Sequence, residues 1–256
     1  MSTDIKTDLT EPTNKLLSRP AESTGKIIGT ILDGLYNTLL LPVQKYNLRV
    51  EANLKQYKEG LNKKIEAVPE NKKVEPSMRI WGETMESLKW NLDDEQKYIR
   101  EVFTNILISD ITTDKKSKVQ PAFIKIVQQL SHEDVKFLEL LNKTGKMSFS
   151  TIELRWEAKD GYIKAPKSPL FVVLGGGLVT PEMRVIENLE RLGLLKWERG
   201  IYLTGEKELC NRIFEAEKAK YDIPESLKNR YEKIEFEQEK LSVTDFGKLF
   251  LETCLG

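Results

Sequence analysis

The sequence predicts a mainly α fold, in which an N-terminal helical bundle is followed by an α+β C-terminal module. Apolar residues recur at helical spacing from residue 27 to about residue 144. After Gly145, short alternating runs separated by glycines and prolines replace that spacing. The 256 residues are 39% hydrophobic, enough for a core of one or two domains. We therefore expect a disordered lead-in (1–24), a helical domain (25–145) and the C-terminal module (146–256).

The first apolar block, residues 27–41, predicts an amphipathic helix that ends at Pro42. Its apolar side includes Ile27, Ile31, Leu35 and Leu39, with polar residues on the other side. The block is too short and too polar for a membrane-spanning helix, which needs about 20 apolar residues. We predict that these four residues form an interaction surface within residues 25–41. It serves either core or inter-subunit packing or contact with a membrane surface.

Five more helices are expected before Gly145. Residues 46–68 carry an apolar seam at Val50, Leu54, Tyr57, Leu61, Ile65 and Val68. Helices follow over about 76–92, 95–111 and 121–130, the last opened by Pro121. Ser131 and Asp134 then form a helix-start pattern, which places His132 in the first turn of another helix.

In the C-terminal module, residues 148–156 alternate weakly between apolar and polar, and residues 170–174 form a short apolar run that ends in three glycines, 175–177. These glycines match no phosphate-binding pattern. Thr180, Pro181 and Glu182 form a helix-start pattern, and residues 194–203 predict a hairpin around Arg199 and Gly200. Residues 206–239 are charged and predict helix, broken near Pro224. A strand at 241–244 and a helix at 245–254 complete the chain.

The order of these elements resembles a winged-helix module with a helical insertion at about 204–240. The Leu192-Gly193-Leu194 step and the Thr244-x-x-Gly247 step carry the resemblance. In a DNA-binding transcriptional regulator of that kind, Arg184, Arg191 and Lys196 are the residues expected to contact nucleic acid. Residues 182–191, however, hold two basic and three acidic residues, which disfavours contact with phosphates. We therefore favour protein interaction and keep DNA binding as the alternative.

Charge and residue types disfavour several other classes. The chain has 40 basic and 40 acidic residues, with one histidine, so it is formally neutral. Its clearest basic surplus, nine basic against five acidic residues, lies in 45–80. The two cysteines, Cys210 and Cys254, are isolated and predict no metal site, no cofactor and a cytoplasmic location. The lead-in has no apolar segment typical of a signal peptide.

We predict no catalytic residues. The single histidine, His132, has no recognisable nucleophile partner. The carboxylates Asp93, Asp94 and Glu95 cluster where a helix begins. A hydrolase or nuclease site there is conceivable, but helix capping is the ordinary role of such residues.

The middle of the chain resembles the bacterial abortive-infection alpha family. The resemblance rests on EQKYIREVFTNIL (95–107), on VQPAFIKIVQQLS (119–131) and on the following Asp134. The family pattern joins an aromatic-x-Asn-Leu-Leu step, a Pro-x-Phe step and a Leu-Ser-x-x-Asp step. Here Gln120 stands where a histidine is expected in many members, and Ala122 replaces a serine.

The resemblance implies a role in bacterial defence against phage, with no established reaction. From the residues alone, Asn105 and Asp134 have structural explanations, as a backbone-bonding amide and a helix-start acid. We expect a non-enzymatic defence component that acts through a protein partner, homo-oligomer formation or membrane-surface contact through residues 25–41. Nucleic acid is the less favoured partner.

Overall fold

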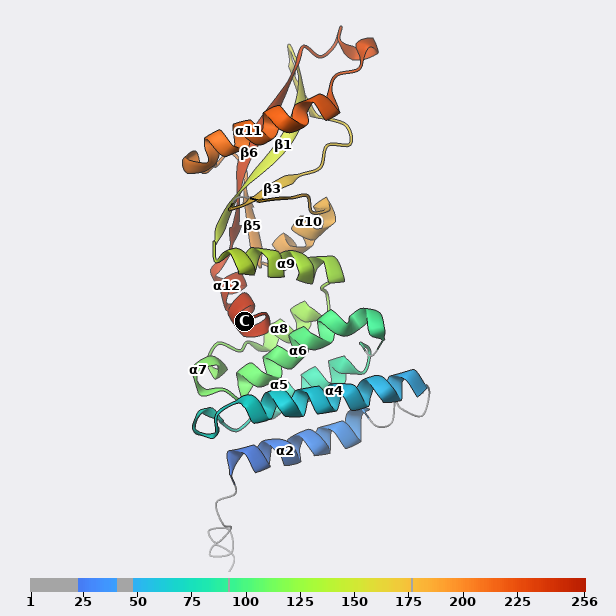
Figure 1. Cartoon of the computed structure of the whole chain (residues 1–256), viewed down its shortest axis with the longest axis vertical. Coiled ribbons are helices and arrows are strands. Elements are labelled where there is room, and N and C mark those ends of the chain that lie inside the picture. The colour runs from blue at the N-terminus through green and yellow to red at the C-terminus, as the bar shows by residue number, and fades with distance from the viewer. Residues whose placement is uncertain (1–22, 41–47, 92, 176) are drawn as a thin grey trace, which may run out of the picture.

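The computed structural model describes residues 23–40, 48–91, 93–175 and 177–256, with the backbone alone for 48–51 and 94. The predicted disordered lead-in lies outside the described residues up to residue 22. The helical part contains α2 (Thr24–Leu35), a π-helical turn η1 (Tyr36–Leu40), α4 (Leu48–Ala67), α5 (Met78–Leu88), α6 (Lys97–Asp110), α7 (Thr113–Lys116), α8 (Pro121–Val127) and α9 (His132–Thr144). Figure 1 shows α2 and α4 at one end of an elongated molecule and the strands at the other.

The C-terminal part is built on a six-stranded antiparallel sheet in the order β4-β3-β1-β6-β5, with β2 paired to β1. The strands are β1 (Ser148–Ala158), β2 (Gly161–Lys164), β3 (Phe171–Leu174), β4 (Gly177–Val179), β5 (Leu195–Glu198) and β6 (Lys233–Val243). Its helices are α10 (Met183–Arg191), α11 (Lys207–Glu217) and α12 (Asp245–Cys254). Short 3-10 turns occur at Glu70–Lys72, Asp94–Gln96, Thr204–Glu206, Lys218–Tyr221 and Glu225–Leu227. The fold is thus mostly helical with a C-terminal antiparallel sheet.

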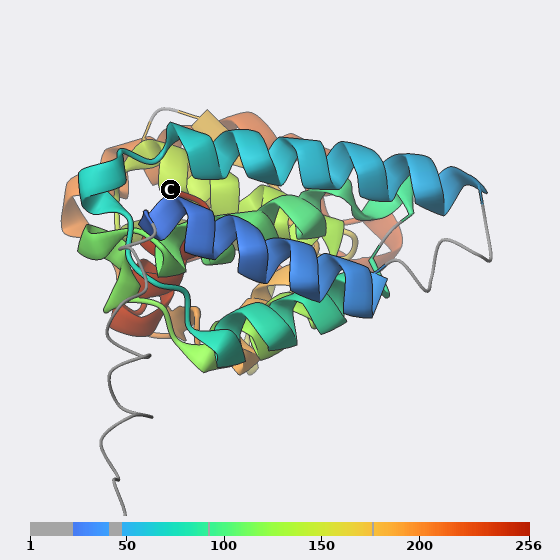
Figure 2. The same ribbon diagram turned by 90° about the horizontal axis from the view of Figure 1, so that it is seen from below.

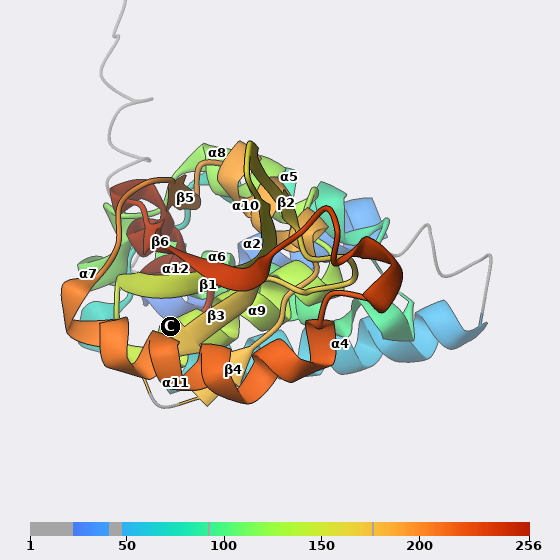
Figure 3. The same cartoon turned by 90° about the horizontal axis from the view of Figure 1, so that it is seen from above.

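One large apolar core joins the helical part to the sheet. It includes Trp81 of α5, Phe103 of α6 and Phe149 of β1, all fully buried. The last helix, α12, returns to the helical part and packs Phe250 against Phe123 of α8. A second core lies between the sheet and α11, which crosses one sheet face in Figures 1 and 3. The carboxyl-terminal helix therefore ties the two parts of the chain together.

The predicted helical insertion at about 204–240 is wrong over its last eight residues. Helix α11 forms as expected, but residues 233–240 belong to β6 and pair with β1 in register from Glu157↔Lys233 to Ser150↔Lys240. Charged residues alternate there with Ile234 and Phe236, a period of two that helical spacing does not have. Phe236 packs against Phe214 of α11, with ring centroids 5.0 Å apart. The high charge of this segment therefore concealed a strand.

The predicted hairpin around Arg199 and Gly200 is also wrong. Strand β5 pairs with the end of β6, in the register Leu195↔Val243, and residues 201–203 form no strand. Because the partner strand lies about 40 residues further along the chain, local sequence cannot identify it. Helix α10 likewise begins at Met183, with Glu182 as its N-cap, rather than at the Thr180 and Pro181 pattern.

A close contact joins the Leu-Gly-Leu step to the start of α12. The Thr244 hydroxyl accepts a hydrogen bond from the Gly247 amide at 2.8 Å and lies 2.6 Å from the Gly193 carbonyl oxygen, to which it donates. The Thr244 amide donates to the Leu194 carbonyl oxygen at 3.1 Å. A Cβ atom at Gly247 would lie 2.1 Å from that same oxygen. The Thr-x-x-Gly pattern is therefore explained by close packing.

Replacing Glu239 of β6 with glutamine is expected to stabilise the fold at neutral pH. Glu239 is 7% exposed, and burial raises the pKa of its carboxyl above the ordinary 4.5, with the neighbouring Glu237 acting in the same direction. Between the ordinary and the raised pKa the folded state binds more protons than the unfolded state. The native free energy of unfolding therefore falls as pH rises through this window.

The Glu239→Gln variant lacks this pH dependence, and its amide oxygen can still accept from the Gly200 amide, as Glu239 does at 3.3 Å. Urea unfolding at a series of pH values measures the effect. The two proteins should be closest in stability at low pH and diverge as pH rises. A variant that is less stable than the native protein at neutral pH would contradict this prediction.

Candidate functional site

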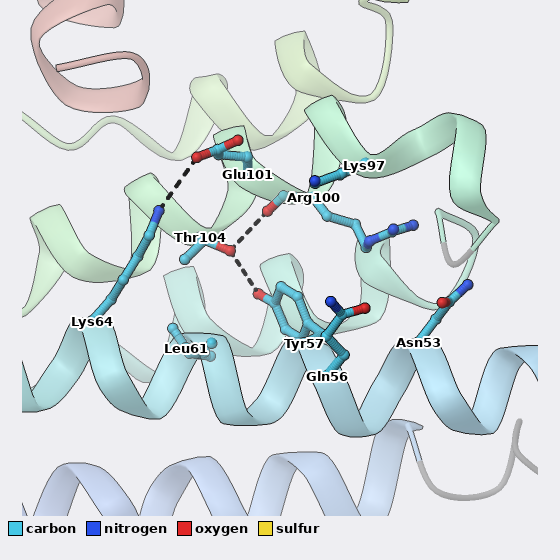
Figure 4. Close-up of a pocket in the computed structure, with 10 residues that line it drawn as sticks. Asn53, Gln56, Tyr57, Leu61, Lys64, Lys97, Arg100, Glu101 and Thr104 are labelled. Carbon is cyan, nitrogen blue, oxygen red and sulfur yellow. Dashed lines mark hydrogen bonds and ion pairs between the residues drawn. The ribbon is translucent and has the colours of Figure 1, made fainter.

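A cleft of about 470 Å³ lies between α4 and α6. Figure 4 shows α4 along one side and α6 along the other. Both helices contribute side chains at i, i+3, i+4 and i+7 spacing, which places each set on one helix face. The lining residues are Asn53, Gln56, Tyr57, Gly60, Leu61 and Lys64 of α4 and Lys97, Arg100, Glu101 and Thr104 of α6.

The floor of the cleft is largely apolar. Leu61 is buried, and the Tyr57 side chain reaches across to α6. Hydrogen bonds join the Thr104 hydroxyl to the Arg100 carbonyl oxygen at 2.8 Å and to the Tyr57 hydroxyl at 3.3 Å. Burial raises the pKa of the Tyr57 hydroxyl well above its usual 10.0, so it stays protonated at neutral pH. Tyr57 therefore lines the cleft as an uncharged side chain with one polar atom.

The rim of the cleft is basic. Three lining residues are cationic, Lys64, Lys97 and Arg100, against one acid, Glu101, a formal surplus of +2 in a neutral chain. The Arg100 guanidinium donates to the carbonyl oxygens of Asn91 and Asp93 at 2.9 and 2.5 Å, which fixes its position.

The other two cations of the rim differ in how firmly they are held. The Lys64 ammonium donates to Asn105 Oδ1 at 3.2 Å and lies 3.7 Å from Glu101 Oε1. Lys97 is exposed and forms no ion pair within the described part of the chain. This arrangement suits a ligand that has an anionic group at the rim and an apolar part against the floor of the cleft.

The predicted interaction residues of the first helix lie along the edge of its packed side. Ile28, Leu32, Tyr36 and Leu40 are buried, whereas Ile27, Ile31, Leu35 and Leu39 are half-buried, and the last three of these pack against the main core. Figure 2 shows α2 alongside α4. The Lys58 ammonium of α4 lies 2.7 Å from Asp33 Oδ1 and 4.5 Å from the centre of the Tyr36 ring. The apolar side of α2 therefore faces the protein.

The residues of the nucleic-acid alternative are exposed but engaged with their neighbours. The Arg184 guanidinium lies 2.6 Å from a Glu182 carboxylate oxygen and 3.6 Å from one of Glu133, and the hydrogen bond that Arg184 donates to Glu182 raises the pKa of Arg184. Arg191 donates to Gln129 Oε1 at 3.0 Å and to Asn188 Oδ1 at 2.6 Å. Lys196 lies 3.6 Å from Glu198 on β5. DNA binding through these three residues stays a prediction.

The polar residues of the Asn-Ile-Leu and Leu-Ser-x-x-Asp steps hold elements together. The Asn105 amide donates to the Cys254 carbonyl oxygen at 2.8 Å, which ties α6 to the end of α12. Asp134 is buried, and its Oδ2 atom accepts from the Ser131 amide at 2.7 Å and from Asn188 Nδ2 at 2.9 Å. The expected bond from Asn105 to a neighbouring backbone and the capping box at Ser131 are confirmed.

His132 is exposed in the first turn of α9, as predicted, and stacks on Tyr98, with ring centroids 4.1 Å apart. Asp93 is exposed just before the 3-10 turn Asp94–Gln96, and Glu95 is exposed within it. The Asp94 side chain lies outside the described residues. Gln120, which replaces the expected histidine, is half-buried at the start of α8 and forms no capping hydrogen bond.

The two cysteines are buried in different cores, and burial raises the pKa of both thiols. Each therefore packs as a small apolar side chain, as expected. Among the described residues, no group of three or more His, Cys, Asp or Glu side chains is placed to hold a metal ion. None of the described helices combines the length and the apolar character needed to cross a membrane.

Sequence reasoning did not identify the cleft, although two signals pointed toward it. The basic surplus in 45–80 includes Lys64, and the motif block 95–107 includes Lys97 and Arg100. The apolar spacing places Tyr57 and Leu61 in a core seam. This is confirmed for the buried Leu61, whereas the half-buried Tyr57 also lines the cleft. A period of 3.6 identifies the packed face of each helix but not which polar faces meet across a gap.

Comparison with known proteins identifies one family. A family model described as "Abortive infection alpha" matches residues 49–254, and the cleft lies within this range. No curated protein matches. One similar solved structure is an uncharacterized protein from the hydrocarbon-degrading marine bacterium Alcanivorax borkumensis SK2. It has 16% sequence identity and a TM-score of 0.30, and the alignment covers 53% of this chain and 93% of that one.

Proposed function

The chain belongs to the abortive infection alpha family, and on that premise we propose that it defends the bacterial cell against phage as a non-enzymatic component that acts by binding. Family membership indicates abortive-infection defence. The binding mode, the absence of catalysis and a cytoplasmic location are our proposals.

The α4/α6 cleft is the observation that supports a binding role. Its polar groups are ammonium and guanidinium cations, side-chain amides, the Glu101 carboxylate, the Thr104 hydroxyl and a tyrosine that stays protonated at neutral pH. Groups of this kind hold a ligand by charge and hydrogen bonds. The guanidinium of Arg100 and the hydroxyl of Tyr57 are already fixed by neighbouring atoms, which lowers the entropy lost when a ligand binds.

We further propose that α2 carries the contact with a protein partner, a second copy of the chain or a membrane surface. The half-buried apolar residues Ile27, Ile31, Leu35 and Leu39 form the proposed contact surface, and the exposed residues Lys26, Thr30 and Asn37 lie on the other side of this segment. Contact with a membrane would need the apolar side of α2 to leave the core, because interfacial helices bury that side in lipid.

The DNA-binding alternative has less support. Glu182 and Glu133 flank Arg184 and offset its charge, while Arg191 is directed to Gln129 and Asn188. A duplex would have to displace these contacts before its phosphates could reach the two arginines.

Replacing both Lys64 and Lys97 with alanine is expected to abolish protection against phage. The double substitution removes two of the three cations from the rim and leaves the apolar floor intact. The efficiency of plaque formation on cells that express each variant measures the effect, with expression levels checked in parallel. We expect plaque numbers on the variant to approach those on cells without the protein.

The matched control is the Lys55→Ala/Lys63→Ala variant. Both lysines are exposed on α4 and do not line the cleft, so this variant changes the net charge equally. It should protect like the native protein. Equal protection by all three proteins would contradict a role for the cleft, and equal loss in both variants would assign the effect to overall charge.

A further inference from the structure

We propose that the open edge of β6, residues 233–237, binds an extended segment of a partner protein in which basic and apolar residues alternate. The segment would add a strand to the C-terminal sheet, which is a recurring mode of peptide recognition. Figure 1 shows this sheet at the opposite end of the molecule from α2 and α4. The edge is therefore a contact surface separate from α2 and from the α4/α6 cleft.

Strand β6 is paired along one side but only at its end along the other. On one side β1 pairs with residues 233–242, whereas on the other side β5 pairs only with residues 240–243. Among the described residues, no further strand pairs with β6, and no loop makes a backbone hydrogen bond to residues 233–239. Residues 233–237 therefore form an edge that an incoming strand can reach.

The alternation of the backbone shows which groups face this edge. In an antiparallel ladder, successive residues point their N–H and C=O groups to opposite sides. The Val243 amide donates to the residue just before β1 at 2.8 Å, and the Thr244 amide donates to the residue just before β5 at 3.1 Å. Odd-numbered residues of β6 therefore face β1, and Ile234 and Phe236 turn their backbone groups to the open edge.

The side chains of the same segment define the chemistry of the partner. Ile234 and Phe236 are half-buried and pack against the core between the sheet and α11. Glu235 and Glu237 alternate with them and lie on the other face of the sheet. Residues 232–237 hold three glutamates and one lysine, a formal charge of −2 in a neutral chain. An added strand thus meets apolar side chains on one face and mostly carboxylates on the other.

A basic partner fits this edge better than a second copy of β6. Two paired copies would bring their glutamates onto neighbouring strands, where like charges repel. Lysine or arginine at alternate positions of a partner instead places cations beside Glu235 and Glu237. These carboxylates already contact Lys233 at 2.7 Å and Arg155 at 3.4 Å. Each can accept further hydrogen bonds, because a carboxylate offers about four lone-pair sites.

Isothermal titration calorimetry on the full chain tests the proposal with three peptides of equal length. The first alternates lysine and valine, the second alternates glutamate and valine, and the third is the first with N-methylated valines. Valines opposite Ile234 and Phe236 share a face with them and would exchange backbone hydrogen bonds with them. We expect saturable binding of the first peptide and at least about 10-fold weaker binding of the other two.

The Ile234→Pro variant is expected to weaken binding of the lysine-valine peptide by about 10-fold or more, the loss of one backbone hydrogen bond. Proline removes the N–H at the open edge and leaves the bonds between β6 and β1 in place. The matched Ile234→Ala variant loses the same apolar side chain but keeps the N–H, so it should bind more tightly than Ile234→Pro.

The Glu235→Lys variant tests the charge preference in a way that misfolding cannot imitate. It should bind the lysine-valine peptide about threefold more weakly and the glutamate-valine peptide more tightly than the native protein does. The matched Glu66→Lys variant makes the same change at an exposed position of α4 and should bind both peptides like the native protein.

Several outcomes would overturn the proposal. One is the absence of saturable binding of the lysine-valine peptide at millimolar concentration. Others are equal binding of the glutamate-valine or the N-methylated peptide, and equal affinity of the native protein and Ile234→Pro. A native protein that sediments as a dimer, and as a monomer after Ile234→Pro, would assign the edge to a second copy instead.

Discussion

Replacing Gly247 with alanine is expected to lower the free energy of unfolding by about 3 kcal/mol or more, at the upper end of the cost of overpacking. The added Cβ would lie 2.1 Å from the Leu194 carbonyl oxygen and 3.1 Å from Val243 Cγ1. That oxygen cannot retreat easily, because it accepts the Thr244 amide hydrogen and belongs to the residue just before β5. Relief of the clash would therefore move α12 away from the sheet.

Urea unfolding followed by circular dichroism measures this loss, with Gly60→Ala as the matched control. Gly60 lies in the interior of α4, where an added Cβ meets nothing within 4 Å. Alanine there should leave stability unchanged or raise it by up to about 1 kcal/mol, the difference in helix propensity between the two residues. Equal stability of Gly247→Ala and the native protein would contradict this prediction, because it would show that the backbone relieves the contact with Leu194 without loss of free energy of unfolding.

Replacing Ile31 and Leu35 with aspartate is expected to abolish protection against phage and leave the remainder of the chain folded. Both side chains are half-buried on α2 and pack against the main core. Charged groups there would lose water or force α2 away from the core, since an unpaired carboxylate in an apolar contact is strongly unfavourable. The family model begins at residue 49, so the elements it covers do not include α2.

The efficiency of plaque formation measures the loss, and cooperative thermal unfolding shows that the remainder still folds. A Thr30→Asp/Asn37→Asp variant adds the same two charges on the exposed side of the same segment and should protect normally. Unchanged protection by Ile31→Asp/Leu35→Asp would remove α2 from the mechanism. Loss in both variants would point to charge rather than to the apolar side.

Sequence alone predicted most helices and the mainly helical fold class. The seam at Leu54, Leu61 and Ile65 predicted α4, and Ser131 with Asp134 predicted the start of α9. These predictions succeed because a helix is specified by neighbours three or four residues apart. The resemblance of residues 95–131 and Asp134 likewise indicated the abortive infection alpha family, and the family match over 49–254 confirms it.

The tertiary structure decided what depends on distant partners. Strand β6 was predicted in part as helix because Glu and Lys dominate residues 233–240, and the strand forms there through pairing with β1. The cleft joins Asn53 and Gln56 to Lys97 and Arg100, polar residues whose separate positions predict only two solvated helix faces. The sequence by itself determined which faces are buried, because burial follows from local periodicity. Only the packing of α4 against α6 determined which polar faces meet, because that depends on the whole core.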